Sequence, residues 1–369
     1  MKFSIFLTQE CNLQCSYCYI QKKAITMSTQ TAEKAIDFVF NRAKSFKETI
    51  NIGWFGGEPL LEFERLKEFT LLTKKHPSYS PDNVVFCLVS NGTIFDDEIG
   101  EFFKENGIIY GISCDGPAVV QNKFRKFRNG QGTSKSVERT ILRANHLLGH
   151  IMVNAVYSPF TLRFLPETIR YFSELGVRQI YLTPDYSAFW DKKAITLLPK
   201  IYEEIGNLYI AYHKNDDPHY ISLIDNKIAV ILKNGYDQKD RCRMGIAEYA
   251  ITPEGKVFPC ERLVGNGNNN HKIGDIFNGI DPKFMLCHCA NGQPINKDCL
   301  ECGLKDYCMN WCGCSNYMTS GYYNRVSSFL CYSEKTILQT SFRIFKHLEK
   351  EMGSLFYEYI VGKALSESV

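Results

Sequence analysis

The first half of the chain alternates short apolar runs with longer segments in which apolar positions recur every three to four residues. Such runs are typical of buried strands, and the longer pattern is typical of amphipathic helices. The strand candidates are "KFSIFL" (2–7), "INIGWF" (50–55), "VVFCLV" (84–89), "IIYGIS" (108–113), "IMVNAVY" (151–157) and "RQIYLT" (178–183). Helical patterns lie near 31–45, 61–75, 96–106, 135–149 and 164–175. These repeats predict an α/β fold with a parallel sheet, either a doubly wound sheet or a partial barrel.

The second half of the chain has a different pattern of apolar and polar residues. Residues 191–235 have a helical pattern, but from about residue 240 short segments are separated by Gly, Asn, Pro and Cys, as in "GNGNNN" (265–270). A region with so little apolar periodicity needs cross-linking, for example by metal, to be compact. An amphipathic pattern near 333–352 predicts a final helix.

Composition excludes several classes of protein. The chain has 369 residues, 44% of them hydrophobic, with 43 basic and 40 acidic residues and a net charge of +3. No basic run suggests a nucleic-acid partner. No stretch reaches the roughly 18–20 apolar residues that span a bilayer. The apolar start is also too short for a secretory signal, so we expect a cytoplasmic protein with no membrane partner.

The 15 cysteines are unevenly distributed. Three lie at 11–18, Cys87 and Cys114 are isolated, and ten lie between 242 and 331. Clustered thiols in a chain without a secretory signal favour metal ligands over disulfides. Two separate clusters therefore predict two metal-bearing regions.

The first cluster lies in "CNLQCSYCY", which places Cys11, Cys15 and Cys18 on one polar stretch after the first strand. Three thiolates leave one corner of a four-ligand site open. Structural zinc normally takes four protein ligands, and the nearest histidine in sequence is His76. An iron–sulfur cluster with one open iron is favoured over zinc, which stays an alternative.

A Cys-x-x-x-Cys-x-x-Cys motif after the first strand of a βα repeat resembles the signature of the radical SAM family. The resemblance implies that Cys11, Cys15 and Cys18 hold a [4Fe–4S] cluster whose open iron binds the amine and carboxylate of S-adenosylmethionine (SAM). One electron then releases a 5′-deoxyadenosyl radical, and the cofactor supplies this chemistry. The aromatic residue before the third cysteine, Tyr17, matches the position that lies near adenine.

Further segments match the family at the carboxyl ends of the next strands, where cofactors of parallel α/β folds bind. "GGEP" follows the second strand, "VSNGT" ends the third and "ISCDGP" ends the fourth. The implied SAM contacts are Gly56, Gly57, Glu58, Ser90, Asn91 and Ser113, with Arg125 as a carboxylate partner. Gln121 and Asn122 replace the His and Asp that are common in one subgroup, and Arg128 is an alternative to Arg125.

The later cysteines resemble the SPASM extension of radical SAM enzymes nearly position by position, with "CLECGLKDYCMNWC" (299–312) as the densest segment. The resemblance implies one auxiliary [4Fe–4S] cluster on Cys299, Cys302, Cys308 and Cys331, and a second on Cys242, Cys260 and Cys312. The second set lacks a fourth ligand. The candidates are Cys287, Cys289, Cys314, Glu248 or a thiolate of the substrate.

One carboxylate is a candidate catalytic base. In anaerobic sulfatase-maturating relatives, an Asp acts as a base directly after the second cysteine of this segment, and Glu261 stands there in "FPCERLVG". The alternative is an ion pair with the neighbouring Arg262 or another cation, and the sequence favours this alternative slightly.

The resemblance implies a partial (βα)6 barrel, TIM-like, followed by a small cluster-binding SPASM domain and a C-terminal helix. The expected boundaries are 1–185 for the barrel, 186–238 for a helical bridge, 239–335 for the SPASM domain and 336–369 for the terminal helix. No recognition domain precedes Cys11, so any leader peptide is expected to bind the barrel or the terminal helices.

The implied function is radical modification of a peptide or protein side chain, with SAM and three [4Fe–4S] clusters as cofactors. "CERLVG", "KIGDIFNGI" and "CGCSNY" resemble maturases of ribosomal Cys-repeat peptides, which form thioether or carbon–carbon cross-links. The expected partners are a Cys-containing peptide and an electron donor such as flavodoxin or ferredoxin. Formylglycine formation on a sulfatase is the alternative within the class. A zinc-stabilised binding module without redox chemistry is the alternative outside it.

Overall fold

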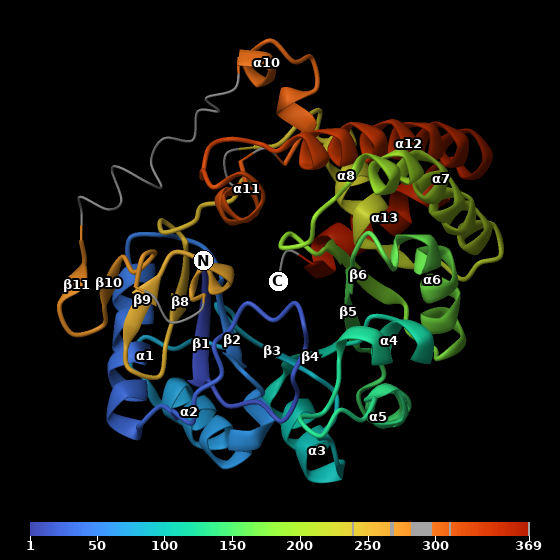
Figure 1. Ribbon diagram of the computed structural model, residues 1–369. Coiled ribbons are helices and arrows are strands. Elements are labelled where there is room, and N and C mark those ends of the chain that lie inside the picture. The colour runs from blue at the N-terminus through green and yellow to red at the C-terminus, as the bar shows by residue number, and fades with distance from the viewer. Residues whose placement is uncertain (238–239, 266–268, 282–296, 310, 368–369) are drawn as a thin grey trace. The chain divides into compact units, whose positions relative to one another are not determined.

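The computed structural model describes residues 1–237, 240–265, 269–281, 297–309 and 311–367 (Figure 1). These residues form two compact units. Unit 1 comprises Met1–Ser113, Gln121–Ile151 and Arg243–Asn291, and unit 2 comprises Cys114–Val120, Met152–Cys242 and Gly292–Val369. The chain has the mixed α/β fold with a parallel sheet that the sequence predicted. The boundaries expected at 185, 238 and 335 stay a prediction, since each unit draws on both halves of the chain.

Unit 1 is built on a parallel sheet that begins at the N-terminus. Its first strands are β1 (Lys2–Thr8), β2 (Ile50–Gly56), β3 (Val84–Ser90) and β4 (Ile108–Ser113), paired in that order. Its helices are α1 (Thr29–Ala43), α2 (Phe63–Lys75), α3 (Asp97–Asn106) and α5 (Ser134–Leu148), with a 3₁₀ turn η1 at Pro59–Glu62. Figure 1 shows α1, α2 and α3 on the outer face of β1–β4. Parallel pairing brings the carboxyl ends of the four strands to one edge of the sheet.

A second group of strands extends this sheet on the other side of β1. The parallel partner of β1 there is β8 (Glu248–Ile251), where Phe3 lies opposite Tyr249. Antiparallel strands β9 (Lys256–Phe258), β10 (Gly274–Asp275) and β11 (Gly279–Ile280) follow, with a 3₁₀ turn η3 at Glu261–Leu263. A buried apolar cluster joins the two parts of the sheet: Phe6, Ile20, Ala250, Phe258 and Val264. The Cys260 region is therefore packed on the same sheet as the first cysteine motif.

Unit 2 contains the remaining parallel strands and most of the long helices. Its strands are β5 (Met152–Tyr157), β6 (Gln179–Pro184) and β7 (Tyr220–Ile221). The helices are α6 (Leu165–Glu174), α7 (Lys192–Lys214), α8 (Ser222–Leu232), α10 (Lys297–Leu300), α11 (Gly313–Ser320), α12 (Ser328–Met352) and α13 (Ser354–Glu367). Short turns η2 (Leu162–Phe164) and η5 (Lys305–Tyr307) complete it, and α4 (Ala118–Phe124) lies at the division between the units.

The elements begin and end where local chemistry predicts. The Ser28 and Asp96 side chains cap α1 and α3 by accepting the backbone N–H groups of Thr31 and Ile99 at 3.1 and 2.9 Å. Helix α3 ends at Gly107, whose φ of +64° suits the left-handed cap that glycine adopts without strain.

The six predicted strands are confirmed to within a residue at each end, and the helical patterns among them are confirmed to within two residues. The segment 191–235 contains two helices, α7 and α8, with β7 between them. The predicted terminal helix begins five residues earlier than expected, at Ser328, and α13 follows it. No helix among the described residues is long and apolar enough to cross a membrane.

Candidate functional site

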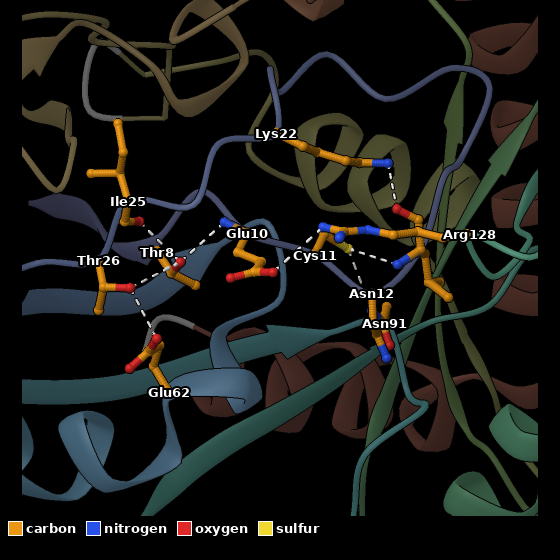
Figure 2. Close-up of polar contacts among 11 residues, drawn as sticks. Thr8, Glu10, Cys11, Asn12, Lys22, Ile25, Thr26, Glu62, Asn91 and Arg128 are labelled. Atoms are coloured by element: carbon orange, nitrogen blue, oxygen red, sulfur yellow. Dashed lines mark hydrogen bonds and ion pairs between the residues drawn. The ribbon is translucent and has the colours of Figure 1, made fainter.

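The loop that follows β1 carries the first three cysteines, and neighbouring backbone holds it in place. Gln14 donates its backbone N–H to the Lys126 carbonyl at 2.8 Å, and Ser16 donates to the Phe124 carbonyl at 3.1 Å. The loop is therefore paired with the segment after α4, as in a short irregular ladder. The Lys22 ammonium also donates to the carbonyl of Leu13 at 2.5 Å, which closes the loop on itself (Figure 2).

The two glycines at the end of β2, Gly56 and Gly57, let the start of this loop approach the sheet. Gly57 donates its backbone N–H to the Thr8 carbonyl at 2.9 Å, and Glu58 donates to the Glu10 carbonyl at 2.8 Å. A Cβ on Gly56 would stand 2.6 Å from the Thr8 oxygen, and one on Gly57 would overlap the Glu10 carbonyl. Only glycine permits this close approach. The glycine pair thus fixes the chain immediately before Cys11.

Glu58 is fully buried at the carboxyl ends of β2 and β3. Its two carboxylate oxygens accept the backbone N–H groups of Leu60 at 3.1 Å and Asn91 at 2.7 Å. Burial raises the pKa of this carboxyl to about 7, although these hydrogen bonds favour the charged form. Glu58 therefore ties the ends of two strands together, and its contact with the SAM amine stays a prediction.

A polar network reaches the first cysteine from the end of β3 (Figure 2). The Asn91 amide donates to the Asn12 side-chain oxygen at 2.8 Å and to the Cys11 sulfur at 3.7 Å. The Asn12 amide in turn donates to the Thr93 hydroxyl at 2.8 Å. Cys11 is only 5% exposed, and burial raises the pKa of its thiol to about 11. An N–H donor directed at a ligand sulfur is a typical outer-shell contact of a metal site.

Sequence reasoning missed Asn12 and Thr93. Both stood inside segments already quoted, "CNLQC" and "VSNGT", but nothing in the pattern paired them. Parallel strands bring their carboxyl ends to one edge of the sheet, so polar residues that follow β1 and β3 were candidates for contact although β2 lies between these strands.

Arg125 and Tyr17, expected from separate motifs, lie together. The Arg125 side chain is buried, and its guanidinium carbon stands 5.4 Å from the centre of the Tyr17 ring. The Tyr17 ring also packs on Phe124 at 5.9 Å between ring centres. A cation over an aromatic face is an attractive contact, so each residue orients the other. Arg128 instead is exposed and stands 3.7 Å from the Glu10 carboxylate, as Figure 2 shows.

The remaining expected contacts line the same edge. Ser90 is buried, and its hydroxyl accepts the Gly92 backbone N–H at 2.9 Å, while Ser113 is half-buried at the end of β4. Gln121 and Asn122 have structural partners at the start of α5: their amides donate to the hydroxyls of Thr133 and Ser134 at 3.0 and 2.9 Å.

Cys15 is half-buried and Cys18 is exposed, and the Cys18 backbone N–H donates to the Cys15 carbonyl at 3.2 Å. Among the residues that the structure describes, no three His, Cys, Asp or Glu side chains are already arranged around a metal-sized point. The donor chemistry nevertheless fits an iron–sulfur cluster, because one loop supplies three thiols that form no disulfide, and the Cys11 sulfur accepts a hydrogen bond from an amide.

The later cysteines lie in both units. Cys260 lies in unit 1, directly after the β8–β9 hairpin. In unit 2 the sulfurs of Cys312 and Cys314 stand 3.6 Å apart, and Cys314 is 3% exposed. Hydrogen bonds with Cys242 and Cys314 lower the pKa of Cys312 despite its burial. Of the candidates for a fourth ligand, the structure thus brings Cys314 to Cys242 and Cys312.

The other candidates for that ligand do not join this group in unit 2. Glu248 begins strand β8 in unit 1. Cys287 and Cys289 lie outside the described residues.

The cysteines assigned to the other auxiliary cluster lie in unit 2 on short elements. Cys299 lies in α10, Cys302 and Cys308 flank the turn η5, and Cys331 lies in the first turn of α12. All four are half-buried and none forms a disulfide. Sulfur-only donors of this kind suit iron–sulfur clusters or zinc.

Glu261 forms an ion pair, and its partner is Lys2. The Lys2 ammonium stands 3.4 Å from one carboxylate oxygen, and the Ser4 hydroxyl donates to the other at 3.4 Å. Burial raises the pKa of Glu261, but Lys2 and Arg262 outweigh it, so the pKa is lowered. The alternative to a base was an ion pair with Arg262 or another cation. That ion pair is present, and its cation is Lys2. The role of a base stays a prediction.

Comparison with known proteins places this geometry in a family. Residues 5–161 match the model of the radical SAM superfamily. A cysteine-type anaerobic sulfatase-maturating enzyme of Clostridium novyi (strain NT) is 25% identical, and the alignment covers 97% of this chain and 96% of that protein.

Two solved structures share the fold. One is native anSMEcpe with bound AdoMet and Cp18Cys peptide, with a TM-score of 0.79 at 20% identity over 95% of this chain and 99% of that chain. The other is Streptococcus suis SuiB bound to the precursor peptide SuiA, with a TM-score of 0.64 at 14% identity over 89% and 75%. Residues 5–161 therefore form a radical SAM domain, and this chain is an enzyme that carries that domain.

Proposed function

We propose that this enzyme uses a SAM-derived radical to modify a side chain of a Cys-containing peptide or protein. The observation that carries the proposal is the similarity along nearly the whole chain to a cysteine-type sulfatase-maturating enzyme. A second support is the fold, which is shared with one protein solved with AdoMet and a peptide and another solved with a precursor peptide. Cytoplasmic location and an electron donor such as flavodoxin or ferredoxin belong to the same proposal.

The residues of unit 1 have defined tasks in this scheme. Cys11, Cys15 and Cys18 hold the cluster, which together with SAM supplies a 5′-deoxyadenosyl radical when reduced by one electron. Asn91 fixes Cys11 through its amide, 3.7 Å from the sulfur. Tyr17 and Arg125 present an aromatic face and a buried cation, which suit the adenine ring and the carboxylate of SAM. Gly56, Gly57, Glu58, Ser90, Asn91 and Ser113 complete the proposed contacts.

The later cysteines hold two auxiliary [4Fe–4S] clusters in the same proposal, which makes this part of the chain a SPASM domain. One cluster is assigned to Cys299, Cys302, Cys308 and Cys331, and the other to Cys242, Cys260 and Cys312. When bound, an auxiliary cluster would accept the electron that the substrate radical gives up after hydrogen abstraction, and a protein base would take the accompanying proton. Glu261 is the candidate base, and its ion pair with Lys2 is the observation that weighs against this role.

Two products are compatible with this chemistry. A thioether forms when a C–H and an S–H hydrogen leave and a C–S bond joins the two atoms. Formylglycine forms when a cysteine loses two hydrogens and water replaces its sulfur as the aldehyde oxygen. The segments "CGCSNY" and "KIGDIFNGI" support the cross-link, and the similarity to sulfatase-maturating enzymes supports formylglycine at least as well.

Mass spectrometry of reacted peptides separates the two. Full-length protein, reconstituted with iron and sulfide and reduced with dithionite, is incubated with SAM and a Cys-containing peptide encoded beside the gene, or with a sulfatase-derived peptide. Loss of two hydrogens with blocked thiol labelling indicates a cross-link. Loss of two hydrogens with exchange of sulfur for oxygen indicates formylglycine. Formation of 5′-deoxyadenosine without any change in either peptide would contradict the proposed substrate class.

Metal analysis of the same sample tests the alternative outside the class. About twelve irons per chain are expected for three clusters, at about four irons each. Stoichiometric zinc without iron would indicate a binding module and end the proposal.

A further inference from the structure

An ion pair between a buried lysine and a half-buried glutamate joins helices α8 and α12 in unit 2. The Lys227 ammonium stands 2.5 Å from one oxygen of the Glu334 carboxylate, and the two side chains are 5% and 21% exposed. The same oxygen accepts the backbone N–H of Met309 at 2.9 Å. The ammonium also lies 5.7 Å from the centre of the Tyr236 ring. A single carboxylate oxygen therefore accepts hydrogen bonds from the lysine ammonium and from a backbone amide of the loop.

This pair lies next to two cysteines of one proposed cluster. Met309 directly follows Cys308 in the chain, so the amide held by Glu334 belongs to the residue after that thiol. Glu334 lies three residues after Cys331 within α12, which is about 4.5 Å along the helix axis and on the same face. Burial lowers the pKa of Lys227, but Glu334, Tyr236 and Cys308 outweigh it, so the pKa is raised and the ammonium stays charged.

Stability alone does not explain this pair. Removing two charges from water costs about as much as their attraction returns, and apolar replacements of buried pairs are often neutral or stabilising. A fixed charge in a poorly solvated region, however, acts strongly on other charges nearby. The reduction potential of an iron–sulfur cluster responds to such charges and to hydrogen bonds around its sulfurs.

We propose that Lys227 and Glu334 are positioning residues that set the reduction potential of the auxiliary cluster held by Cys299, Cys302, Cys308 and Cys331. The inference rests on the proposed function, which supplies that cluster. Uptake of one electron makes the cluster more negative. The Lys227 ammonium stabilises this reduced form, and the Glu334 carboxylate stabilises the oxidised form. The two charges have opposite effects on the reduction potential. With both present, the potential lies between the higher value expected with Lys227 alone and the lower value expected with Glu334 alone.

The test compares isosteric variants of the full-length, anaerobically reconstituted protein. Lys227→Met removes the cation, and Glu334→Gln removes the anion while its amide oxygen still accepts the Met309 N–H. Potentials are measured by redox titration followed by EPR. We expect Lys227→Met to lower the potential of one cluster, Glu334→Gln to raise it, and the double variant to return close to the wild type. A role limited to holding the loop would shift both single variants in the same direction.

A matched control lies on the same helix. Lys214 pairs with Glu351 of α12 at the same 2.5 Å, but the two side chains are 43% and 40% exposed. Water and salt screen such a pair. Lys214→Met and Glu351→Gln are therefore expected to leave every potential unchanged. Lys227→Gln serves as a second variant where Lys227→Met does not take up iron.

Each other outcome counts against the inference in a distinguishable way. Potentials that do not move, or that move in the same direction in both single variants at full iron content, overturn the tuning role and leave the proposed function intact. Loss of iron in every Lys227 and Glu334 variant but not in the controls also overturns it, in favour of anchoring. An iron content near four per chain in the wild type would correspond to a single cluster. It would show that the auxiliary clusters are absent and would contradict that part of the proposed function.

Discussion

The two cysteine-bearing regions are held in place by different means. In unit 1 the Cys11 loop is fixed by backbone hydrogen bonds to segment 124–127, by the Gly56–Gly57 approach and by the Asn91 amide. In unit 2, Cys299 lies on a four-residue helix, and Cys302 and Cys308 flank a three-residue turn. The first site is built by the sheet and then receives its cofactor. The second is expected to need the cofactor for its own structure.

The largest effect is expected from Cys15→Ala, because it removes one of three ligands from the loop in unit 1. We expect no 5′-deoxyadenosine under dithionite and a loss of about four irons per chain, with both auxiliary clusters retained. Cys87→Ala, which removes a thiol of strand β3 outside every proposed ligand set, serves as the control. A Cys15→Ala protein that still cleaves SAM would show that this loop does not hold the SAM cluster.

Removal of all iron should separate the two regions most directly. Metal binding and folding are coupled where a site does not exist without metal. In chelated protein we expect limited proteolysis to cut first within 297–309 and 311–327, while Met1–Ser113 resists. Peptide mapping by mass spectrometry locates the cuts.

The Cys15→Ala protein provides the control for this experiment, since it is expected to keep its auxiliary clusters and therefore to stay resistant at 297–327. Equal cleavage of both regions in the chelated wild type would contradict the distinction between a preformed and a metal-dependent site.

Gly57→Ala tests the preformed site without touching a ligand. The added Cβ would overlap the Glu10 carbonyl, which cannot move without displacing the loop before Cys11. We expect SAM binding at least about tenfold weaker, equivalent to about 1.4 kcal/mol, by equilibrium dialysis. Gly53→Ala, in the preceding strand β2, is the matched control, because its Cβ would meet Cys87 at an ordinary 3.4 Å. Equal affinities in the two variants would refute the close-approach argument.

The same contrast explains which parts of the fold could be predicted from the sequence. The six predicted strands and their helices could be identified because each is long enough to bury a complete apolar run. Strand β8 was not, since Glu248–Ile251 has only four residues in a Gly- and Pro-punctuated region and is stabilised by pairing with β1. Contacts such as Asn12 with Asn91 depend on loop geometry, which motif spacing does not encode.

The motifs located the cysteine sets and the glycine–glutamate turn, but they did not identify the partners that these side chains have within the protein. Glu58 was expected opposite an ammonium, and the structure places its oxygens on two backbone amides. Glu261 was weighed as a base or as the partner of Arg262 or another cation, and the structure shows that this cation is Lys2, 259 residues earlier in the chain. Contacts between residues that are distant in sequence depend on the order of the strands in the sheet, which the sequence motifs do not specify.

Glu58 gives the smallest and most specific effect, a pH dependence of stability. Its pKa rises to about 7 in the folded protein from an ordinary value of 4.5, mainly through burial. The folded state therefore binds this proton more tightly than the unfolded state. The stabilisation is fully present below pH 4.5 and is lost as the pH rises through 7, for a total of about 3 kcal/mol.

Glu58→Gln should remove this term, because the amide has no proton to lose in this range. We expect the melting temperature of the wild type to fall more steeply between pH 5 and 8 than that of the variant, measured by circular dichroism in buffers of equal ionic strength. Glu64→Gln, at an exposed position of α2, controls for the loss of one negative charge and should keep the wild-type slope. Parallel slopes in Glu58→Gln and wild type would mean that the carboxyl is not held protonated by burial. In that case its two backbone hydrogen bonds outweigh the desolvation, and the edge of the sheet in unit 1 carries a fixed negative charge at neutral pH.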